Sequence, residues 1–588
     1  MSSSQGPVPV TAPASDLPSI YVDEVAGTDD DSSDLGTQEK PHKSLSHAYF
    51  KTEQPERFSY LVRKEEDGEW LPAAKAAMKK AVQWRQTQLK KASKGKEAAA
   101  QQEKEAAERQ KILEEAKKIK VEEDSSLPAA KPIKMSVTDA DVVTLGTEGQ
   151  KGTRVRVWGR VHTVRKQSQL VFVVLRASDK KLQCLFSGQL AKTYDILTLT
   201  PETCLEVFGE MRSVPSGQKA PDDRELIVDY YEISGKAPEG DDSFATRIPL
   251  DPKTGEVRSD DKEAFYDIRH LVLRTELASS LMRVRSATKK AFRQVYQELD
   301  IEEADPPALV QTQCEGGSTL FEFDYYGQKA YLTQSSQLYL ETLLPSLGDC
   351  YCIEKSFRAE KSLTRRHLSE YLHVEAELDF IQFTDLLAHI EHIICRVIDI
   401  LMAQPAIKSI IEKLHPEFKP PQRPFMRMKY AEAIDWLRDE GILTDEGKPH
   451  EFGDDIAEAA ERRMTDKIGK PILLTHFPGP IKSFYMPPDA ADPRVTESVD
   501  VLMPGVGEIV GGSMRIYDYE QIIAAYKRDG FTQKEIESYF WYTDQRKYGG
   551  SPHGGYGLGL ERFIAWLCKQ HTVRETTMYP RYMGRCKP

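Results

Sequence analysis

The stretch Ser356-Phe-Arg-Ala-Glu-Lys-Ser-Leu-Thr-Arg-Arg-His-Leu-Ser-Glu-Tyr-Leu-His-Val-Glu-Ala-Glu377 decides the fold that the sequence predicts. It indicates two strands joined by a basic loop. Arg358 and Glu360 lie two residues apart, so they would share one face of the first strand. Such a polar strand pair makes a poor core but a good floor for a charged ligand, because a fixed arginine binds phosphate through two parallel hydrogen bonds. The alternative is an exposed hairpin with solvated charges.

A second stretch, Gly554-Gly-Tyr-Gly-Leu-Gly-Leu-Glu-Arg-Phe-Ile-Ala-Trp-Leu567, is the expected partner of the hairpin. Its alternating glycines allow backbone or ligand to approach closely. Apolar residues from Leu558 onward then take helical spacing, with Arg562 at the start of the helix. Together the two stretches resemble motifs 2 and 3 of class II aminoacyl-tRNA synthetases. The resemblance is greatest to the cytoplasmic asparaginyl enzymes of eukaryotes and extends over nearly the whole chain.

Composition sets limits on the class of protein. The 588 residues exceed one ordinary domain, and a hydrophobic content of 40% is enough for a large core. The net charge of −12 argues against a uniformly basic nucleic-acid-binding surface, although local patches can still bind tRNA. Eight scattered cysteines without a Cys-x-x-Cys motif favour reduced core thiols and argue against a zinc site. We expect a cytoplasmic protein without a secretory signal or a membrane span.

Changes in composition along the chain predict its domains. Residues 72–130 are rich in Ala, Lys, Gln and Glu and are expected to form a charged helix with a basic first half. This helix either contacts tRNA or presents a solvated face. The expected segments are a disordered tail (1–20), a small appended domain (21–71), the charged helical extension (72–130), an OB-fold anticodon-binding domain (131–245), a linker (246–265) and a class II catalytic domain (266–588) with an insertion at about 380–480.

Short alternating strands after residue 140 predict a small barrel. The pattern resembles the OB-fold anticodon-binding domain of the aspartyl/asparaginyl group. By that resemblance Phe172 stacks on an anticodon base, Gln183 recognises a base edge, and Arg160 and Arg165 bind phosphate. The alternative for Phe172 is ordinary barrel core.

The resemblance implies an α+β catalytic domain, in which helices flank an antiparallel sheet. It also implies that ATP, Mg²⁺, L-asparagine and tRNA(Asn) take part in the reaction. An amphipathic helix over 276–298, followed by Pro307, resembles motif 1 and implies a homodimer.

The resemblance also assigns the nucleotide-binding residues. Arg358, Glu360 and Arg562 form the catalytic set, with Arg358 contacting the α-phosphate and the amino-acid carboxylate. Glu360 meets the amino side of adenine or a metal-bound water, while Tyr371 and Arg562 sandwich the adenine ring. The complete ATP-binding set is Arg358, Glu360, Arg366, His367, Tyr371, Glu508, Gly559 and Arg562, with Arg366 and His367 at the γ-phosphate.

Two carboxylates, Asp500 and Glu508, are predicted to flank a hairpin turn near the triphosphate. Carboxylate oxygens there suit Mg²⁺ that bridges phosphate oxygens, and the resemblance implies this role for both. Ser335 and Gln337, two residues apart and predicted to share a face, would bind the ammonium group of the amino acid. Glu315, in the lid-like segment Thr312–Ser318, would complete that site.

The choice of amino acid depends on a few positions. Aspartyl enzymes have a lysine where this chain has Leu340 and an aspartate where it has Glu375. Glu375 can accept a hydrogen bond from an amide, and Arg515 can donate one to the amide oxygen, so asparagine fits better than aspartate. An aspartyl enzyme is the alternative within the class. A ligase that makes an amino-acid amide and a non-catalytic tRNA-binding scaffold are the alternatives outside it.

Overall fold

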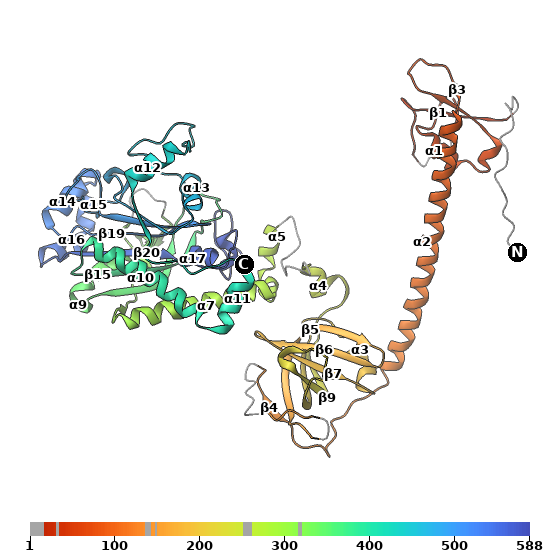
Figure 1. The fold of residues 1–588 in the computed structure, drawn as a ribbon, viewed down its shortest axis with the longest axis horizontal. Helices are drawn as coiled ribbons and strands as arrows, with labels where there is room; N and C mark the ends of the chain where they lie inside the picture. Colours follow the sequence, from red (N-terminus) through yellow and green to blue (C-terminus); the bar gives the residue numbers. More distant parts are fainter. Residues whose placement is uncertain (1–16, 31–34, 136–142, 148–149, 251–261, 315–319) are drawn as a thin grey trace. The chain divides into compact units, whose positions relative to one another are not determined.

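The computed structural model describes residues 17–30, 35–135, 143–147, 150–250, 262–314 and 320–588 (Figure 1). It contains two compact units, residues 1–239 and 240–588. None of the helices in these described ranges is both long enough and apolar enough to cross a membrane.

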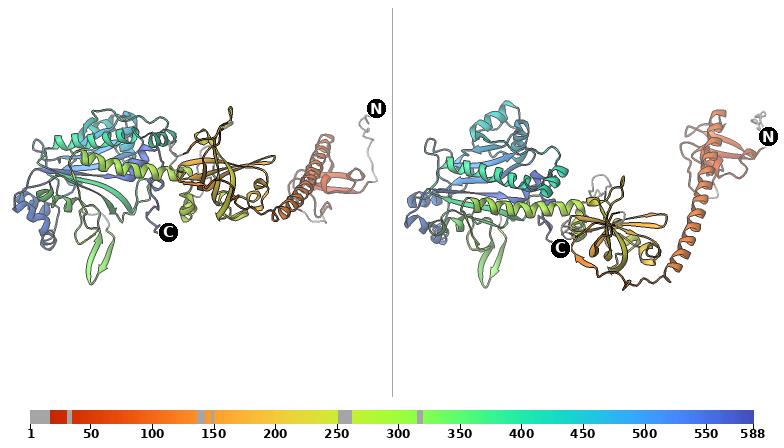
Figure 2. Two further views of the ribbon diagram at one scale, coloured as in Figure 1. Left: turned by 90° about the horizontal axis from the view of Figure 1, so that it is seen from below. Right: turned by 60° about the horizontal axis from the view of Figure 1, so that its bottom comes forward.

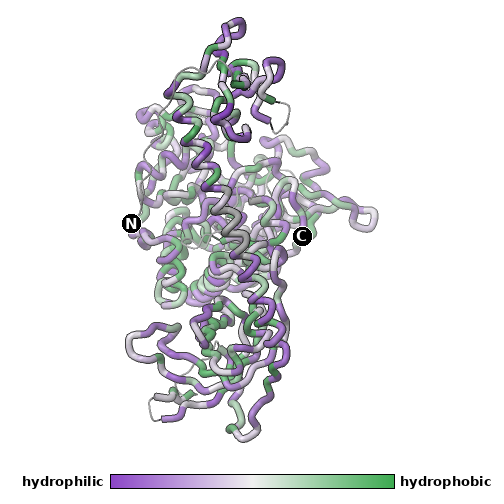
Figure 3. Tube along the Cα trace, turned by 90° about the vertical axis from the view of Figure 1, so that its right-hand side faces the viewer, coloured by the Kyte–Doolittle hydropathy of each residue, from purple (hydrophilic) through white to green (hydrophobic). Residues whose placement is uncertain are grey.

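The first unit begins with a small sheet of three strands, β1 (Ser19–Asp23), β2 (Ser59–Arg63) and β3 (Leu71–Pro72). Helix α1 (Leu45–Lys51) and the first turns of α2 (Lys75–Ala116) pack on it, with Val22, Ala48 and Ala81 fully buried. The remainder of α2 carries mainly charged and polar residues, and it is largely purple and pale in Figure 3. A helix of this composition gains little from packing beyond its first turns.

A closed barrel follows in the same unit. Its strand order is β5-β6-β7-β9-β8, and β8 also pairs with β5 to close the ring. Alternate residues such as Val155, Val157 and Val173 point into a fully buried core. This confirms the expected barrel. The strands are β4 (Lys131–Ile133, flanking β5), β5 (Arg154–Gln167), β6 (Leu170–Ala177), β7 (Lys180–Phe186), β8 (Cys204–Ser213) and β9 (Arg224–Gly235), with the short helix α3 (Tyr194–Leu197).

The second unit is built on an eight-stranded sheet in the order β10-β14-β15-β20-β19-β18-β17-β16. The outermost pairs are parallel, and the pairs between them are antiparallel. The strands are β10 (Glu302–Glu303), β14 (Cys350–Phe357), β15 (Glu370–Asp379), β16 (Met426–Lys429), β17 (Ile472–Thr475), β18 (Ser498–Met503), β19 (Gly507–Met514) and β20 (His553–Gly559). A smaller sheet contains β11 (Leu309–Val310), β12 (Glu322–Tyr325) and β13 (Gln328–Leu332).

The two faces of this sheet differ in polarity. On β15, Val374 and Ala376 enter an apolar core with side chains of α7 (Glu276–Glu298), α10 (Phe383–Met402) and α17 (Leu560–Leu567). Figure 2 shows these helices beside the sheet. Glu375 and Glu377 alternate with the core residues and therefore lie on the other face. One face is thus covered by helices, and the other carries charge.

The segment at about 380–480, predicted as an insertion, contributes directly to the sheet. It contains α10, which packs under the sheet, and the strands β16 and β17, which form one edge. These strands have four residues each, and every residue of β17 is buried, so the sequence shows no alternation there. The further helices of the unit are α4 (Phe244–Arg247), α5 (Lys262–Asp267), α6 (Arg269–Val272), α8 (Gln337–Glu341), α9 (Leu344–Leu347), α11 (Pro405–Leu414), α12 (Tyr430–Asp439), α13 (Glu458–Ile468), α14 (Tyr519–Arg528), α15 (Gln533–Ser538) and α16 (Phe540–Lys547).

Candidate active site

A cavity of about 530 Å³ lies on the charged face of the catalytic sheet. Strands β15, β18, β19 and β20, the loop between β14 and β15, and the start of α17 all contribute to it. It brings together thirteen of the residues predicted for this site. Glu315 lies outside the described residues. The thirteen are Ser335, Gln337, Arg358, Glu360, Arg366, His367, Tyr371, Glu375, Asp500, Glu508, Arg515, Gly559 and Arg562.

The alternating glycines of β20 make room for the charged side chains of β15. In the antiparallel register, Gly557 lies opposite Glu375, and Gly555 lies opposite Glu377. A Cβ atom on Gly557 would collide with the imidazole of His373, and one on Gly555 would collide with the carboxylate of Glu377. The glycine pattern therefore serves the polar face of the neighbouring strand.

Arginine and glutamate alternate at the end of the cavity that is predicted to bind the nucleotide. Arg358 and Glu360 lie in the loop after β14, which ends at Phe357, and not on one strand face as expected. Arg358 lies 3.8 Å from Glu360, and its guanidinium lies 5.6 Å from the centre of the Tyr371 ring. Arg562 Nη1 donates to Glu508 Oε2 at 2.9 Å, and Arg366 Nη2 donates to the Glu508 carbonyl oxygen at 3.0 Å. The guanidinium groups are therefore positioned by carboxylates and carbonyl oxygens of the protein.

A β-bulge places Asp500 and Glu508 around one point. The pairing of β18 with β19 passes from Val501–Val510 to Leu502–Glu508 and skips Ile509. A Cβ atom built on Gly511 would lie 3.5 Å from both Asp500 Oδ1 and Glu508 Oε1. Two carboxylates whose oxygens flank one point on the cavity wall provide the hard oxygen ligands that Mg²⁺ requires, so these residues fit the ion that the resemblance implies.

Burial and neighbouring cations set different pKa values for the two carboxyls. Burial raises the pKa of Asp500 to about 6, which Lys482, 2.9 Å away, offsets in part. Burial also opposes ionisation of Glu508, but Arg562 and Arg366 outweigh it and lower its pKa to about 2. Glu508 therefore stays ionised to a lower pH than Asp500 does.

Glu461, on α13, is a carboxyl of the cavity wall that the sequence did not indicate. Its Oε1 accepts from the Glu508 backbone N–H at 2.8 Å and lies 3.6 Å from Arg366. Burial and the nearby Glu508 charge raise its pKa to about 7. The helix on which it lies is far from both sequence motifs, so no local signal marked it.

Ser335 and Ser336 hold Glu375 at the end of the cavity that is predicted to bind the amino acid. The Ser335 hydroxyl donates to Glu375 Oε1, and the Ser336 backbone N–H donates to Oε2 at 2.9 Å. Helix α8 begins at Gln337, so Ser335 and Gln337 meet the cavity across a helix start and not along one strand face. Leu340 is fully buried in a separate apolar cluster with Cys350 and Cys352, and it does not line the cavity.

A buried charge network lies behind Arg515. Arg515 donates to Glu377 through Nη2 at 2.6 Å and through Nε at 3.3 Å. Glu341 lies 3.9 Å from Arg515 and also accepts from Arg546 and His553. Burial raises the pKa of Glu377 to about 7 in spite of Arg515, whereas Arg546, His553 and Arg515 outweigh burial and lower that of Glu341.

These partners of Arg515 were not predicted. The only local signal was the spacing of Gln337 and Glu341, four residues apart on one helix, whose side chains are hydrogen-bonded at 3.1 Å.

Residues predicted to bind the anticodon lie on adjacent barrel strands. Phe172 is half-buried and outside the barrel core, with the Arg165 guanidinium 5.6 Å from its ring centre. Gln183 is buried, donates to Glu225 at 2.9 Å and accepts from Arg165 at 3.2 Å. Both ends of its amide therefore have partners within the barrel. Arg160 is exposed on β5.

Comparisons with known proteins agree with this architecture. Residues 261–583 match the model of tRNA synthetases class II (D, K and N), and residues 155–234 match the OB-fold nucleic acid binding domain. The fold and the cavity thus define a class II aminoacyl-tRNA synthetase with an OB-fold domain.

The particular family follows from the relatives and from residues 37–128, which match the asparaginyl-tRNA synthetase N-terminal domain. The chain is 47% identical over 583 residues to the cytoplasmic asparagine–tRNA ligase of Saccharomyces cerevisiae, covering 97% of this chain and 100% of the relative. The human cytoplasmic enzyme is 44% identical over 575 residues, again covering 97% and 100%. This chain belongs to the cytoplasmic asparagine–tRNA ligases.

A solved structure supports the assignment. The asparaginyl-tRNA synthetase of Entamoeba histolytica in complex with asparaginyl-adenylate superposes with a TM-score of 0.69 at 40% identity. The match covers 79% of this chain and 100% of that chain.

Proposed function

We propose that this chain activates L-asparagine with ATP in the cavity and transfers it to tRNA(Asn) in the cytoplasm. The observation that carries the choice of amino acid is the pairing of Arg515 with Glu377, beside Glu375. The cation that would otherwise attract an aspartate side chain already has a carboxylate partner. A neutral amide can accept a hydrogen bond from Arg515 and donate one to Glu375, so the pocket favours asparagine.

The first step is attack of the asparagine carboxylate on the α-phosphorus of ATP, with release of pyrophosphate. In the second step a terminal hydroxyl of the tRNA attacks the activated carbonyl carbon, and AMP leaves. Arg358 orients the carboxylate and the α-phosphate, and Arg562 with Tyr371 holds the adenine ring. Positioning and charge neutralisation are expected to supply most of the rate acceleration.

Asp500 and Glu508 would hold Mg²⁺, which neutralises phosphate charge when it is bound. Arg366 and His367 would contact the γ-phosphate end. Burial and the nearby Arg562 charge lower the pKa of His367, so near neutral pH it is a neutral hydrogen-bonding group. Arg366 contributes the permanent charge there.

Recognition of tRNA is proposed for two regions of the first unit. Phe172 and Arg165 offer a stacking surface with an adjacent cation, which suits single-stranded bases. The basic first half of α2 would contact phosphates. We also propose a homodimer, because α7 and Pro307 resemble the motif 1 elements through which class II enzymes associate.

ATP–pyrophosphate exchange with each standard amino acid tests the proposal. Exchange that depends on asparagine, followed by charging of tRNA(Asn), is the expected result. Exchange that depends on aspartate would favour the aspartyl alternative, and exchange with neither would overturn both.

A further inference from the structure

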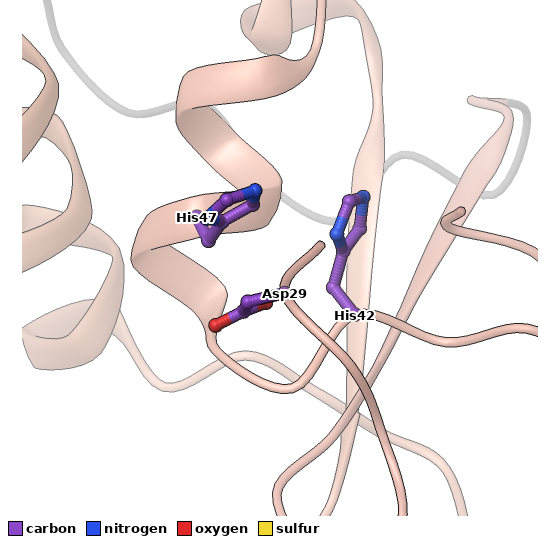
Figure 4. Close-up of side chains that lie close together, drawn as sticks. All are labelled: Asp29, His42 and His47. Carbon is purple, nitrogen blue, oxygen red and sulfur yellow. The ribbon is translucent and has the colours of Figure 1, made fainter. Parts of the chain in front are cut away.

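Three side chains with metal-binding chemistry lie together in the small N-terminal domain. Asp29, His42 and His47 each offer one ligand atom, and these atoms lie within 4.8 Å of one another (Figure 4). His42 is only 5% exposed, and the other two are half-buried. No other group of this kind occurs among the residues that the structure describes.

Local structure explains why the three residues converge. Asp29 Oδ1 accepts from the backbone N–H groups of Lys43 and Ser44, at 3.0 and 3.1 Å, which holds its carboxylate at the start of α1. Ser44 is the N-cap of that helix, and His47 lies in its first turn. The backbone at His42 bridges to Val22 and Thr28, so His42 reaches the same place from the sheet.

The two histidines carry buried nitrogen atoms that none of the described residues satisfies. His42 Nδ1 and His47 Nε2 have no hydrogen-bond partner among the described residues. Leaving such atoms without a partner is costly, and they commonly mark the position of a bound water or ion.

We propose that Asp29, His42 and His47 bind a divalent transition-metal ion of the Zn²⁺ type. Two imidazoles and one carboxylate suit zinc, whereas Mg²⁺ and Ca²⁺ prefer oxygen ligands alone. Tetrahedral zinc with bonds of about 2.0–2.1 Å places its ligand atoms about 3.3 Å apart. Side-chain rotations that move the ligand atoms by roughly 1–2 Å would therefore complete the site. Water would fill the remaining position.

The ion would add a further link between three segments that hydrogen bonds already bring close together. These are the loop at Asp29, the segment at His42 and the first turn of α1. The ion would therefore stabilise the small domain and have no part in amino-acid activation. The site contains no cysteine, so the absence of Cys-x-x-Cys motifs does not bear on it.

The test is zinc binding to the full chain, after treatment with a chelator, by equilibrium dialysis in excess Mg²⁺. The variants Asp29→Asn and His47→Gln each remove one ligand and leave the buried His42 in place. Asparagine also keeps an oxygen for the backbone N–H groups of Lys43 and Ser44. His270→Ala, which removes an exposed histidine of the catalytic unit, is the matched control.

Wild type and His270→Ala should bind one more Zn²⁺ per chain than the two ligand variants. A second measurement is the unfolding midpoint, which zinc should raise in wild type and His270→Ala but not in Asp29→Asn. Equal zinc stoichiometry in all four proteins, or an equal rise in midpoint, would overturn the proposal.

Discussion

Glu377→Gln should make the amino-acid pocket accept aspartate. Glu377 neutralises Arg515 through two hydrogen bonds within a fully buried pair. Glutamine keeps an oxygen that can accept from Arg515 but removes the negative charge. The guanidinium charge then becomes available to the carboxylate of an aspartate substrate, whereas neutral asparagine gains little.

The size of the effect follows from the charges around Arg515. A carboxylate about 4 Å from a guanidinium gains about 4 kcal/mol at an effective dielectric constant of ~20. Glu341 remains 3.9 Å from Arg515 Nε but is shared with Arg546 and His553, so part of the charge stays neutralised. We therefore expect a gain of about 2–4 kcal/mol, which is roughly a 30- to 1000-fold rise in the aspartate-to-asparagine ratio of kcat/KM.

The assay is pyrophosphate exchange with each amino acid at pH 8, where Glu377, with its pKa near 7, is ionised. In wild type, lowering the pH through 7 protonates Glu377 and should raise the same ratio, whereas the variant should lack this pH dependence. Glu391→Gln is the matched control, since Glu391 is buried and accepts from the Phe425 backbone N–H outside the cavity. A ratio that moves less than about threefold in a folded Glu377→Gln protein would refute the reasoning.

Four further predictions follow from the same structure. Arg358→Ala should remove a transition-state contact and so raise the activation free energy of pyrophosphate exchange by about 3 kcal/mol or more. An exchange rate within tenfold of wild type would contradict this role. Glu461→Gln should stabilise the ligand-free protein above pH 7. Because the pKa of Glu461 is raised, the free energy of unfolding of wild type falls by about 3 kcal/mol as pH rises from 4.5 to about 7. Thermal unfolding should therefore show a more stable variant at pH 8 but not at pH 5. Phe172→Ala should raise the KM for tRNA in charging assays by a factor that corresponds to about 1–3 kcal/mol of lost stacking, with the kinetics of pyrophosphate exchange unchanged. An equal loss of activity in charging and in exchange would indicate damage to the barrel. Deleting residues 1–130 should leave exchange intact and make tRNA binding less dependent on salt, and an unchanged salt slope would exclude α2 from the tRNA interface.

The sequence by itself determined the elements whose signals are local. Helix α7 spans Glu276–Glu298 as expected, because its amphipathic pattern is long and Thr275 caps its first turn. The strands on either side of the basic loop and the glycine-rich strand carried the resemblance that indicated both the catalytic domain and the charged residues of its cavity. Alternating strands likewise indicated the barrel.

Only the tertiary structure decided which charges are paired. Arg515 and Glu377 are 138 residues apart, and they meet because β20 brings β19 and β15 into one sheet. Gln183 was predicted from the sequence to contact a base, yet it is buried against Glu225 because β7 pairs with β9. Spacing along the chain reports which face of an element a side chain occupies. The partner it meets there depends on long-range strand order and register, which hydrophobic packing of the whole domain sets.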